Sequence, residues 1–219
     1  MKRLIFLESS VELVPKEIAT HKSIILDSKK RGKNPEEIIL DDSKHHAAMR
    51  SLANREKRGR PDIIHCCLLL FLDSKASKDF EVYIHTINGE IIWVNNKVRL
   101  PRNYNRFLGL IEDLFSKGRI VANGETLLEI TNLRLKDLTA KRKVFVFREG
   151  EKNLEMLKKL DNDSVVCIGA FPHGDFFPET INSLGNPIFI SLGKETYTSL
   201  YVTSRFICEY ERVRSTEDC

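Results

Sequence analysis

The pattern of hydrophobic and polar positions divides the chain into an irregular first quarter and a regular last third. The apolar run 4–7 stops at Glu8, too soon for the apolar part of a signal peptide, and it predicts a first core strand. Residues 15–31 predict a helix. Its apolar side carries Ile18, Ile24, Ile25 and Leu26. Residues 28–60 are polar and basic, which predicts an exposed, mobile insertion.

The middle of the chain carries the clearest local signals. Pro61 is suited to the first position of a helix, and the following run to residue 72 is apolar all round, which predicts a fully buried helix. Two β-rich runs flank Asn88-Gly89, so residues 80–96 predict a β-hairpin with a type I′ turn. Pro101 is expected to open the next helix. Its apolar stripe is Phe107, Leu110, Ile111, Leu114 and Phe115.

The final third alternates strands with helices. We expect strands at 126–130, 143–147, 165–171 and 187–192, and helices at 154–160 and 197–212. This alternation is typical of an α/β fold with a mostly parallel sheet. With 219 residues and no clear boundary, the chain is expected to form a single domain, residues 1–219, that carries the insertion.

Composition narrows the class of protein. No apolar run reaches the roughly 18 residues that span a bilayer, so no membrane association is expected. No two of the five cysteines form a C-x-x-C pair, which favours reduced thiols and a cytoplasmic location. The cysteines are Cys66, Cys67, Cys167, Cys208 and Cys219.

The positive charges are clustered although the net charge is only +4. Any one cluster is most simply a solvated face, but three clusters in the first half of the chain favour a nucleic-acid-binding surface. The clusters are Lys29, Lys30, Arg31 and Lys33, then Arg55, Lys57, Arg58 and Arg60, then Arg99, Arg102 and Arg106.

Several common chemistries are not supported. The sequence has no G-x-G-x-x-G after a strand, no phosphate-binding P-loop and no G-x-S-x-G motif. His65, Cys66 and Cys67 are adjacent and therefore point in different directions, so we interpret them as core residues and predict no metal site. The adjacent His45 and His46 give no stronger signal.

Two glycine-containing segments follow apolar strands in the last third. They are IGAFPHGD (168–175) and ISLGKETYTS (190–199), and parallel sheets bind ligands at the carboxyl ends of their strands. Gly169 and Gly174 would allow a planar ligand to approach the backbone closely. Taken alone, the same pattern also fits two ordinary strand-to-loop turns.

Two arginine-bearing segments stand out. In RPDIIH (60–65), Asp62 could form a plain surface ion pair with Arg60 or could orient its guanidinium toward a phosphate. In VRLPRNYNRF (98–107), Arg102 and Arg106 are expected four residues apart on one helix face. Positive side chains at a helix start oppose the helix dipole, so an anionic partner explains them better than stability does.

Together these segments resemble a known family. RPDI-H, then N-x-x-VR-x-PR-x-x-x-RF, then IGAF-x-HG resemble the ribosome-biogenesis pseudouridine-N1-methyltransferase family of the SPOUT (α/β-knot) class, over about residues 60–206. The more polar ISLGKETYTS, with Thr196 where the eukaryotic form has proline, is similar to a compact archaeal-type member. The resemblance implies a C-terminal trefoil knot, a homodimer and S-adenosyl-L-methionine bound in the knot loops.

The resemblance also assigns roles to residues. Gly169 and Gly174 are implied in the first cofactor loop. The implied second loop comprises Ser191, Leu192, Gly193, Lys194, Glu195, Thr196, Tyr197 and Thr198. The implied RNA-contacting arginines are Arg60, Arg99, Arg102 and Arg106. Asp62 and Arg60 are also the candidate catalytic residues, with Asp62 orienting Arg60, and no general base is assigned.

The implied activity is methylation of N1 of a pseudouridine in small-subunit rRNA, with a role in small-subunit biogenesis. The implied partners are small-subunit rRNA, a second copy of the chain and ribosomal assembly proteins. Two alternatives remain open, namely a non-catalytic rRNA-binding assembly factor and a SPOUT methyltransferase that acts on tRNA. The sequence does not specify which rRNA nucleotide is modified.

Overall fold

The computed structural model describes residues 1–217, and these form one eight-stranded sheet with helices on both faces. The strand order is β4-β5-β3-β2-β1-β7-β6-β8. The strands are β1 (Lys2–Ser9), β2 (Phe80–Thr86), β3 (Ile91–Val94), β4 (Arg119–Ala122), β5 (Glu125–Thr131), β6 (Lys143–Phe147), β7 (Ser164–Gly169) and β8 (Ile188–Ile190).

The sheet has a parallel half and an antiparallel half. β1 pairs in parallel with β2 and β7, and β6 pairs in parallel with β7 and β8. β3, β5 and β4 extend the sheet through antiparallel pairs. β1 and β7 lie between strands on both sides and are almost wholly buried, and each has an apolar centre, at residues 4–7 and 165–168, as expected for parallel strands covered on both faces.

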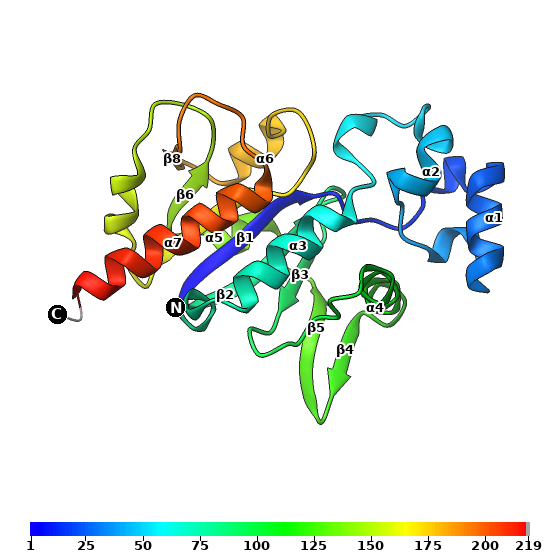
Figure 1. The fold of residues 1–219 in the computed structure, drawn as a ribbon, viewed down its shortest axis with the longest axis horizontal. Coiled ribbons are helices and arrows are strands. Elements are labelled where there is room, and N and C mark those ends of the chain that lie inside the picture. The colour runs from blue at the N-terminus through cyan, green and yellow to red at the C-terminus, as the bar shows by residue number, and fades with distance from the viewer. Residues whose placement is uncertain (218–219) are drawn as a thin grey trace.

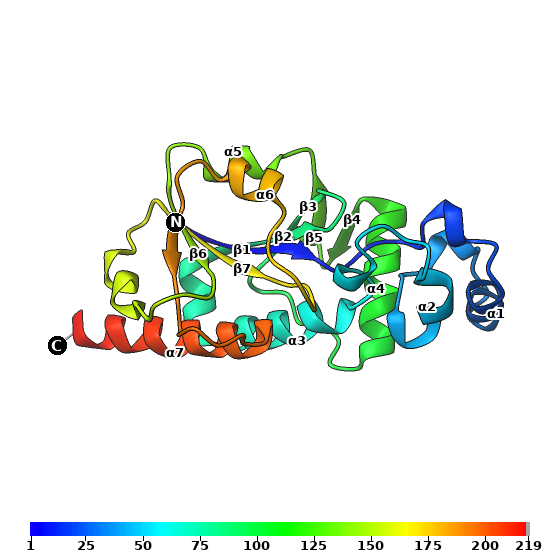
Figure 2. The ribbon, with the colours of Figure 1, turned by 90° about the horizontal axis from the view of Figure 1, so that it is seen from above.

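The helices are α1 (Lys22–Arg31), α2 (Asp42–Met49), α3 (Pro61–Leu72), α4 (Tyr104–Lys117), α5 (Leu135–Thr139), α6 (Pro178–Ser183) and α7 (Ser199–Glu217). Short 3₁₀ segments are Lys16–Ile18, Pro35–Glu37, Arg55–Lys57, Lys75–Asp79 and Leu154–Lys159. α3 and α7 lie side by side on one face of the sheet, and α5 and α6 lie on the other (Figure 1 and Figure 2).

Two apolar cores follow from this layering. The larger lies between the sheet and α3, α4 and α7, and it includes Phe71, Phe107 and Phe206. The smaller lies under α5 and α6 and includes Leu138 and Leu184. The expected α/β class with a mostly parallel sheet and a β-hairpin is therefore confirmed. No helix among residues 1–217 is both long and apolar enough to cross a membrane.

The first quarter of the chain contains two helices and a small apolar core of its own. Residues 10–58, here called the N-terminal unit, carry α1 and α2 beside the main sheet (Figure 1). The unit has its own apolar core, which includes Ile24, Ile38 and Met49. The helix expected over 15–31 begins only at Lys22, because the His21 imidazole accepts a hydrogen bond from the Ser23 N–H and caps it.

The segment around residue 57 was wrongly predicted to be an exposed connection. Lys57 is only 3% exposed, and its neighbour Arg58 forms a double hydrogen bond to the buried Glu12 carboxylate. The polar composition here therefore reflects internal ion pairs. A charge can be buried only when a partner compensates it, and sequence polarity alone does not reveal the partner.

Three local details of the middle segment also differ from expectation. The hairpin is present, but Asn88 lacks the positive φ of a type I′ turn, and Gly89 (φ 92°) takes the left-handed position of a longer loop. α3 is not wholly buried, because Cys66 and Leu70 are exposed. α4 begins at Tyr104, because the Asn103 side chain caps it through the Arg106 N–H.

Candidate cofactor pocket and basic strip

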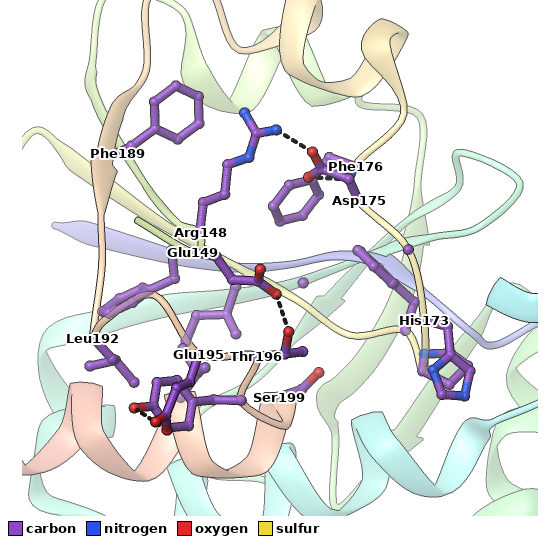
Figure 3. Close-up of a pocket in the computed structure, with 18 of the residues that line it drawn as sticks. Arg148, Glu149, His173, Asp175, Phe176, Phe189, Leu192, Glu195, Thr196 and Ser199 are labelled. Carbon is purple, nitrogen blue, oxygen red and sulfur yellow. Dashed lines mark hydrogen bonds and ion pairs between the residues drawn. The ribbon is translucent and has the colours of Figure 1, made fainter. Parts of the chain in front are cut away.

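One cavity lies at the carboxyl ends of three parallel strands. β6, β7 and β8 run in the same direction, so their carboxyl ends lie at the same edge of the sheet, and a cavity of about 730 Å³ is formed there (Figure 3). That volume lies in the range typical of small-molecule sites. The cavity is lined by the loops that follow each strand and by the start of α7.

The end of β7 and the loop that follows it, residues 169–177, supply an aromatic wall. Phe171 and Phe176 pack edge to face with their ring centroids 5.4 Å apart, and both line the cavity. A Cβ on Gly169 would lie 2.9 Å from Phe171 and 3.2 Å from Phe176. Only glycine therefore leaves these rings in place. Gly174 also lines the cavity and has a φ of +89°, which favours glycine.

The loop after β8 divides into residues that face the cavity and residues that hold the loop. The lining residues are Leu192, Gly193, Glu195, Thr196 and Tyr197. The other three predicted residues have structural contacts. The Ser191 hydroxyl lies 2.9 Å from the carbonyl oxygens of Gly150 and Gly193, and Lys194 pairs with Glu151 at 2.6 Å. The Thr198 hydroxyl accepts a hydrogen bond from Tyr201 N–H at the start of α7.

A third loop, which follows β6, was missed by the sequence analysis. Arg148 and Glu149 line the cavity; Arg148 forms an ion pair with Asp175, and Glu149 accepts a 2.7 Å hydrogen bond from Thr196 (Figure 3). These contacts join the three loops to one another. The signal was available, because Arg148 follows an apolar strand just as Gly169 does.

The cavity combines an apolar surface with negative charge. Phe189 and Leu192 contribute apolar wall, and Glu149 and Glu195 add carboxylates (Figure 3). The pKa of Tyr197 is raised by desolvation and by the nearby Glu195, to which its hydroxyl donates a 3.3 Å hydrogen bond. Such a site suits a ligand with a flat ring, hydroxyl groups and a positive charge.

Arg60 and Asp62 form the planar pair that the sequence suggested. The Arg60 Nε and a terminal guanidinium nitrogen donate to the two Asp62 oxygens, both at 2.8 Å. This hydrogen bonding raises the pKa of Arg60. Both side chains are about two-fifths exposed, so the guanidinium is fixed in orientation but remains accessible. The pair lies at the N-terminal end of α3.

The other three arginines lie along the segment that packs against α3. Arg99 and Arg102 line a shallow groove at the C-terminal end of α3, where Arg102 pairs with Asp73 at 2.7 Å. Arg106 is exposed in the first turn of α4, whereas Arg102 precedes that helix, so the expected shared helix face is wrong. Arg60 is thus separated from Asp73 by the length of α3, about 18 Å.

His65 joins α3 to the segment that carries the other three arginines. Its Nε2–H donates to the Pro101 carbonyl oxygen at 2.7 Å, and its ring stacks on Phe107. The four arginines with α3 and residues 96–106 are here called the basic strip. His65 therefore has the structural role that the sequence analysis gave it. Among residues 1–217, no group of three potential ligands that could hold a metal ion was found.

The chain is an α/β protein of the SPOUT class, with a small-molecule cavity at the carboxyl ends of parallel strands and a separate set of exposed arginines along α3 and residues 96–106. It belongs to the EMG1/NEP1 methyltransferase family, whose model matches residues 4–211. It is similar to proteins named ribosomal RNA small subunit methyltransferase Nep1. The relative from Archaeoglobus fulgidus is 60% identical over 96% of both chains. The relative from Sulfurisphaera tokodaii is 50% identical over 80% of this chain and 82% of its own.

A solved structure has the same fold. The crystal structure of Archaeoglobus fulgidus Nep1 bound to S-adenosylhomocysteine matches with a TM-score of 0.92 and 58% identity, over 98% of this chain and 99% of that chain. The family that the sequence segments resembled is therefore confirmed.

Proposed function

We propose that this chain transfers a methyl group from S-adenosyl-L-methionine to N1 of a pseudouridine in small-subunit rRNA, as a step in small-subunit biogenesis. The observation that carries the proposal is the cavity at the ends of β6, β7 and β8, in a chain 58% identical to a structure bound to S-adenosylhomocysteine. Small-subunit rRNA is the substrate named for the relatives.

The cavity fits this cofactor. S-adenosyl-L-methionine supplies an electrophilic methyl group on a positively charged sulfur. In our proposal the apolar wall of Phe176, Phe189 and Leu192 holds the adenine, and Gly169 leaves room for the Phe176 ring of that wall. Glu149 and Glu195 favour a positive charge in the cavity, and a carboxylate also accepts hydrogen bonds from ribose hydroxyls.

The basic strip is proposed to hold the RNA. Arg99, Arg102 and Arg106 are exposed and suited to phosphate oxygens, and Arg60 is oriented by Asp62. The reacting base has to leave its stack before N1 can reach the methyl group. In this mechanism the N1 proton passes to solvent water and Arg60 stabilises the negative charge that develops on the base. Positioning supplies much of the acceleration.

A homodimer is the proposed assembly, and α3 with α7 is its proposed interface. Leu70, Leu200 and Tyr201 are between 36% and 46% exposed on these neighbouring helices. Tyr201 also packs 5.0 Å from Tyr197, which lines the cavity, so the interface would reach the cofactor pocket. Large apolar side chains exposed on two neighbouring helices are in keeping with an interaction surface.

We further propose that the chain works as one domain in the cytoplasm, and that ribosomal assembly proteins are additional partners. The described cysteines Cys66, Cys67, Cys167 and Cys208 are free thiols, in keeping with a reducing compartment. Cys219 lies outside the described residues.

The substrate is tested with two synthetic rRNA hairpins that differ only in one base. Purified protein and isotope-labelled S-adenosyl-L-methionine should add one methyl group to the pseudouridine hairpin and none to the uridine hairpin. The reason is that N1 of uridine is already bonded to the sugar. RNA binding without methyl transfer would instead identify an assembly factor, and labelling of tRNA alone would identify a tRNA methyltransferase.

A further inference from the structure

A buried ion pair lies directly beneath the first cofactor loop, outside the cavity. The Glu8 and Lys57 side chains are 1% and 4% exposed, and the Lys57 ammonium donates to a Glu8 carboxylate oxygen. Neither residue lines the cavity. Glu8 is the second-last residue of the central strand β1, and Lys57 ends a 3₁₀ segment of the N-terminal unit.

The pair holds two backbone groups of the loop at residues 169–177. The Lys57 ammonium donates a 2.7 Å hydrogen bond to the Asp175 carbonyl oxygen. The second Glu8 carboxylate oxygen accepts a 2.7 Å hydrogen bond from Phe177 N–H. Lys57 and Glu8 therefore each form one contact with the other and one contact with the loop backbone. The two loop contacts, at Asp175 and Phe177, are two residues apart.

Aromatic rings complete the environment of the ammonium. The Lys57 Nζ lies 3.8 Å from the centroid of Phe171 and 3.9 Å from that of Phe177, both from the same loop. Cation–π contacts of this kind strengthen when water is excluded. Phe171 also lines the cavity, so the Lys57 ammonium contacts a ring that forms part of the ligand site.

The backbone of β1 is adapted to this arrangement. Glu8 has a φ of +49°, which is unfavourable for a residue with a side chain, and its N–H donates to the His85 Nδ1 at 3.3 Å. The Ser10 hydroxyl donates to the Lys57 carbonyl oxygen at 2.5 Å, and the Ser10 N–H donates to the Ala170 carbonyl oxygen at 3.1 Å. The turn at Glu8 thus joins the loop to the N-terminal unit.

We propose that Lys57 and Glu8 are positioning residues that hold the 169–177 loop in its ligand-binding shape. Through Lys57, the N-terminal unit helps to set the affinity of the cofactor pocket. The inference rests on the proposed function for the identity of the ligand, but the loop contacts themselves do not depend on it. Because two charges and two backbone groups are involved, removal of the pair should loosen the loop specifically.

A neighbouring ion pair supplies a matched control. Arg58 donates to both oxygens of Glu12 at 2.7 and 2.6 Å, and these side chains are also largely buried. Their other hydrogen-bond partners are Ala53 and Asn88, which lie outside the 169–177 loop. The two pairs thus differ mainly in whether they contact that loop.

The experiment compares the double variant Glu8→Gln/Lys57→Met with the control Glu12→Gln/Arg58→Met in the full-length chain. Each removes both charges of its pair, so no buried charge is left uncompensated. Calorimetry measures S-adenosylhomocysteine binding, and hydrogen exchange of the unliganded protein measures protection of residues 170–177. We expect the test variant to bind at least tenfold more weakly and to exchange faster in the loop. The control should bind within about twofold of wild type, even if its melting temperature falls by as much as that of the test variant.

The outcomes separate this inference from the proposed function. Failure of the wild type to bind S-adenosylhomocysteine would contradict the proposed function, while faster loop exchange would still support the role of the pair in holding the loop. Unchanged affinity in a folded test variant, or an equal loss in the control, would overturn the inference. If the double variant does not fold, Glu8→Gln alone is measured, and unchanged affinity and loop exchange there would also overturn it.

Discussion

Gly169 is the position where one added carbon should change the cofactor pocket most. In Gly169→Ala the new Cβ would lie too close to Phe171 and Phe176, so both rings have to move into the cavity or away from it. We expect calorimetry to show S-adenosylhomocysteine binding weakened by about tenfold or more, which is about 1.4 kcal/mol. Gly109→Ala is the control, because its Cβ meets nothing within 4 Å, and it should bind normally. Unchanged affinity in a folded Gly169→Ala would place the ligand elsewhere.

Also at the scale of single residues, a substitution of Arg102 tests whether the basic strip contacts RNA. If Arg102 contacts a phosphate, Arg102→Ala should weaken RNA binding and lower the log–log salt slope by about 0.7 for single-stranded RNA. Cofactor affinity and melting temperature should stay nearly unchanged, since the pair with Asp73 is exposed. Arg134→Ala is the control, because Arg134 forms a similar exposed pair with Asp137 at α5, on the opposite face of the sheet. Filter binding across a salt series measures the RNA affinity and the salt slope of each variant. An equal effect in the two variants would contradict the assignment of Arg102 as a phosphate contact.

At the scale of elements, Glu112 connects α4 to the N-terminal unit. Its carboxylate is fully buried and accepts hydrogen bonds from Arg31, Lys33 and the Ile39 N–H, at 2.6, 2.8 and 3.0 Å. α4 therefore presents an apolar stripe to the sheet and one acid to the N-terminal unit. Such a buried acid at the junction makes the position of α4 depend on the N-terminal unit.

Glu112→Gln should destabilise this junction strongly. The substitution leaves two positive side chains without their buried partner, which typically costs about 3 kcal/mol when a buried pair is broken. The neighbouring Asp113→Asn is the control, because Asp113 is about half exposed and its pairs should contribute less than about 1 kcal/mol. Urea unfolding followed by circular dichroism measures both variants. Equal midpoints would show that the Glu112 cluster does not stabilise the fold.

At the scale of the whole molecule, the exposed apolar face of α3 and α7 should determine the oligomeric state. One chain has a mass of 25.2 kDa, so light scattering should give about 50 kDa for a twofold dimer. Leu200→Asp places a charge in the proposed interface and should shift the mass toward the monomer at micromolar concentration. Leu133→Asp is the control, because Leu133 is 42% exposed, close to the 43% of Leu200, but lies outside α3 and α7. A wild-type mass of about 25 kDa would exclude the dimer.

Lys57 was wrongly assigned to an exposed basic segment because its partners are distant along the chain. Its neighbours in sequence are charged, and local polarity normally indicates solvent. Its contacts come from Glu8 and from residues 171–177, far away along the chain. Long-range pairing of this kind leaves no periodic signal in a single sequence.

The sequence by itself determined the elements that can be recognised from the apolar and polar pattern within one short segment. Residues 143–147 were predicted correctly because a strand covered on both faces is a short continuous apolar run, and the stripe of α4 because one-sided burial repeats at the period of a helix. The order and spacing of the arginine and glycine segments also identified the family. Gly169 and Gly174 were placed in the cavity lining because a ligand site follows the ends of parallel strands.

Only the tertiary structure decided which side chains meet. It placed Ser191, Lys194 and Thr198 in structural contacts beside the cavity and added Arg148 and Glu149 to its lining. It also separated Arg60 from Arg102 along α3. These contacts depend on the order in which strands pair and on the direction of each side chain. Both are set by packing of the whole chain, because a charge or hydroxyl takes whichever partner the fold brings within reach.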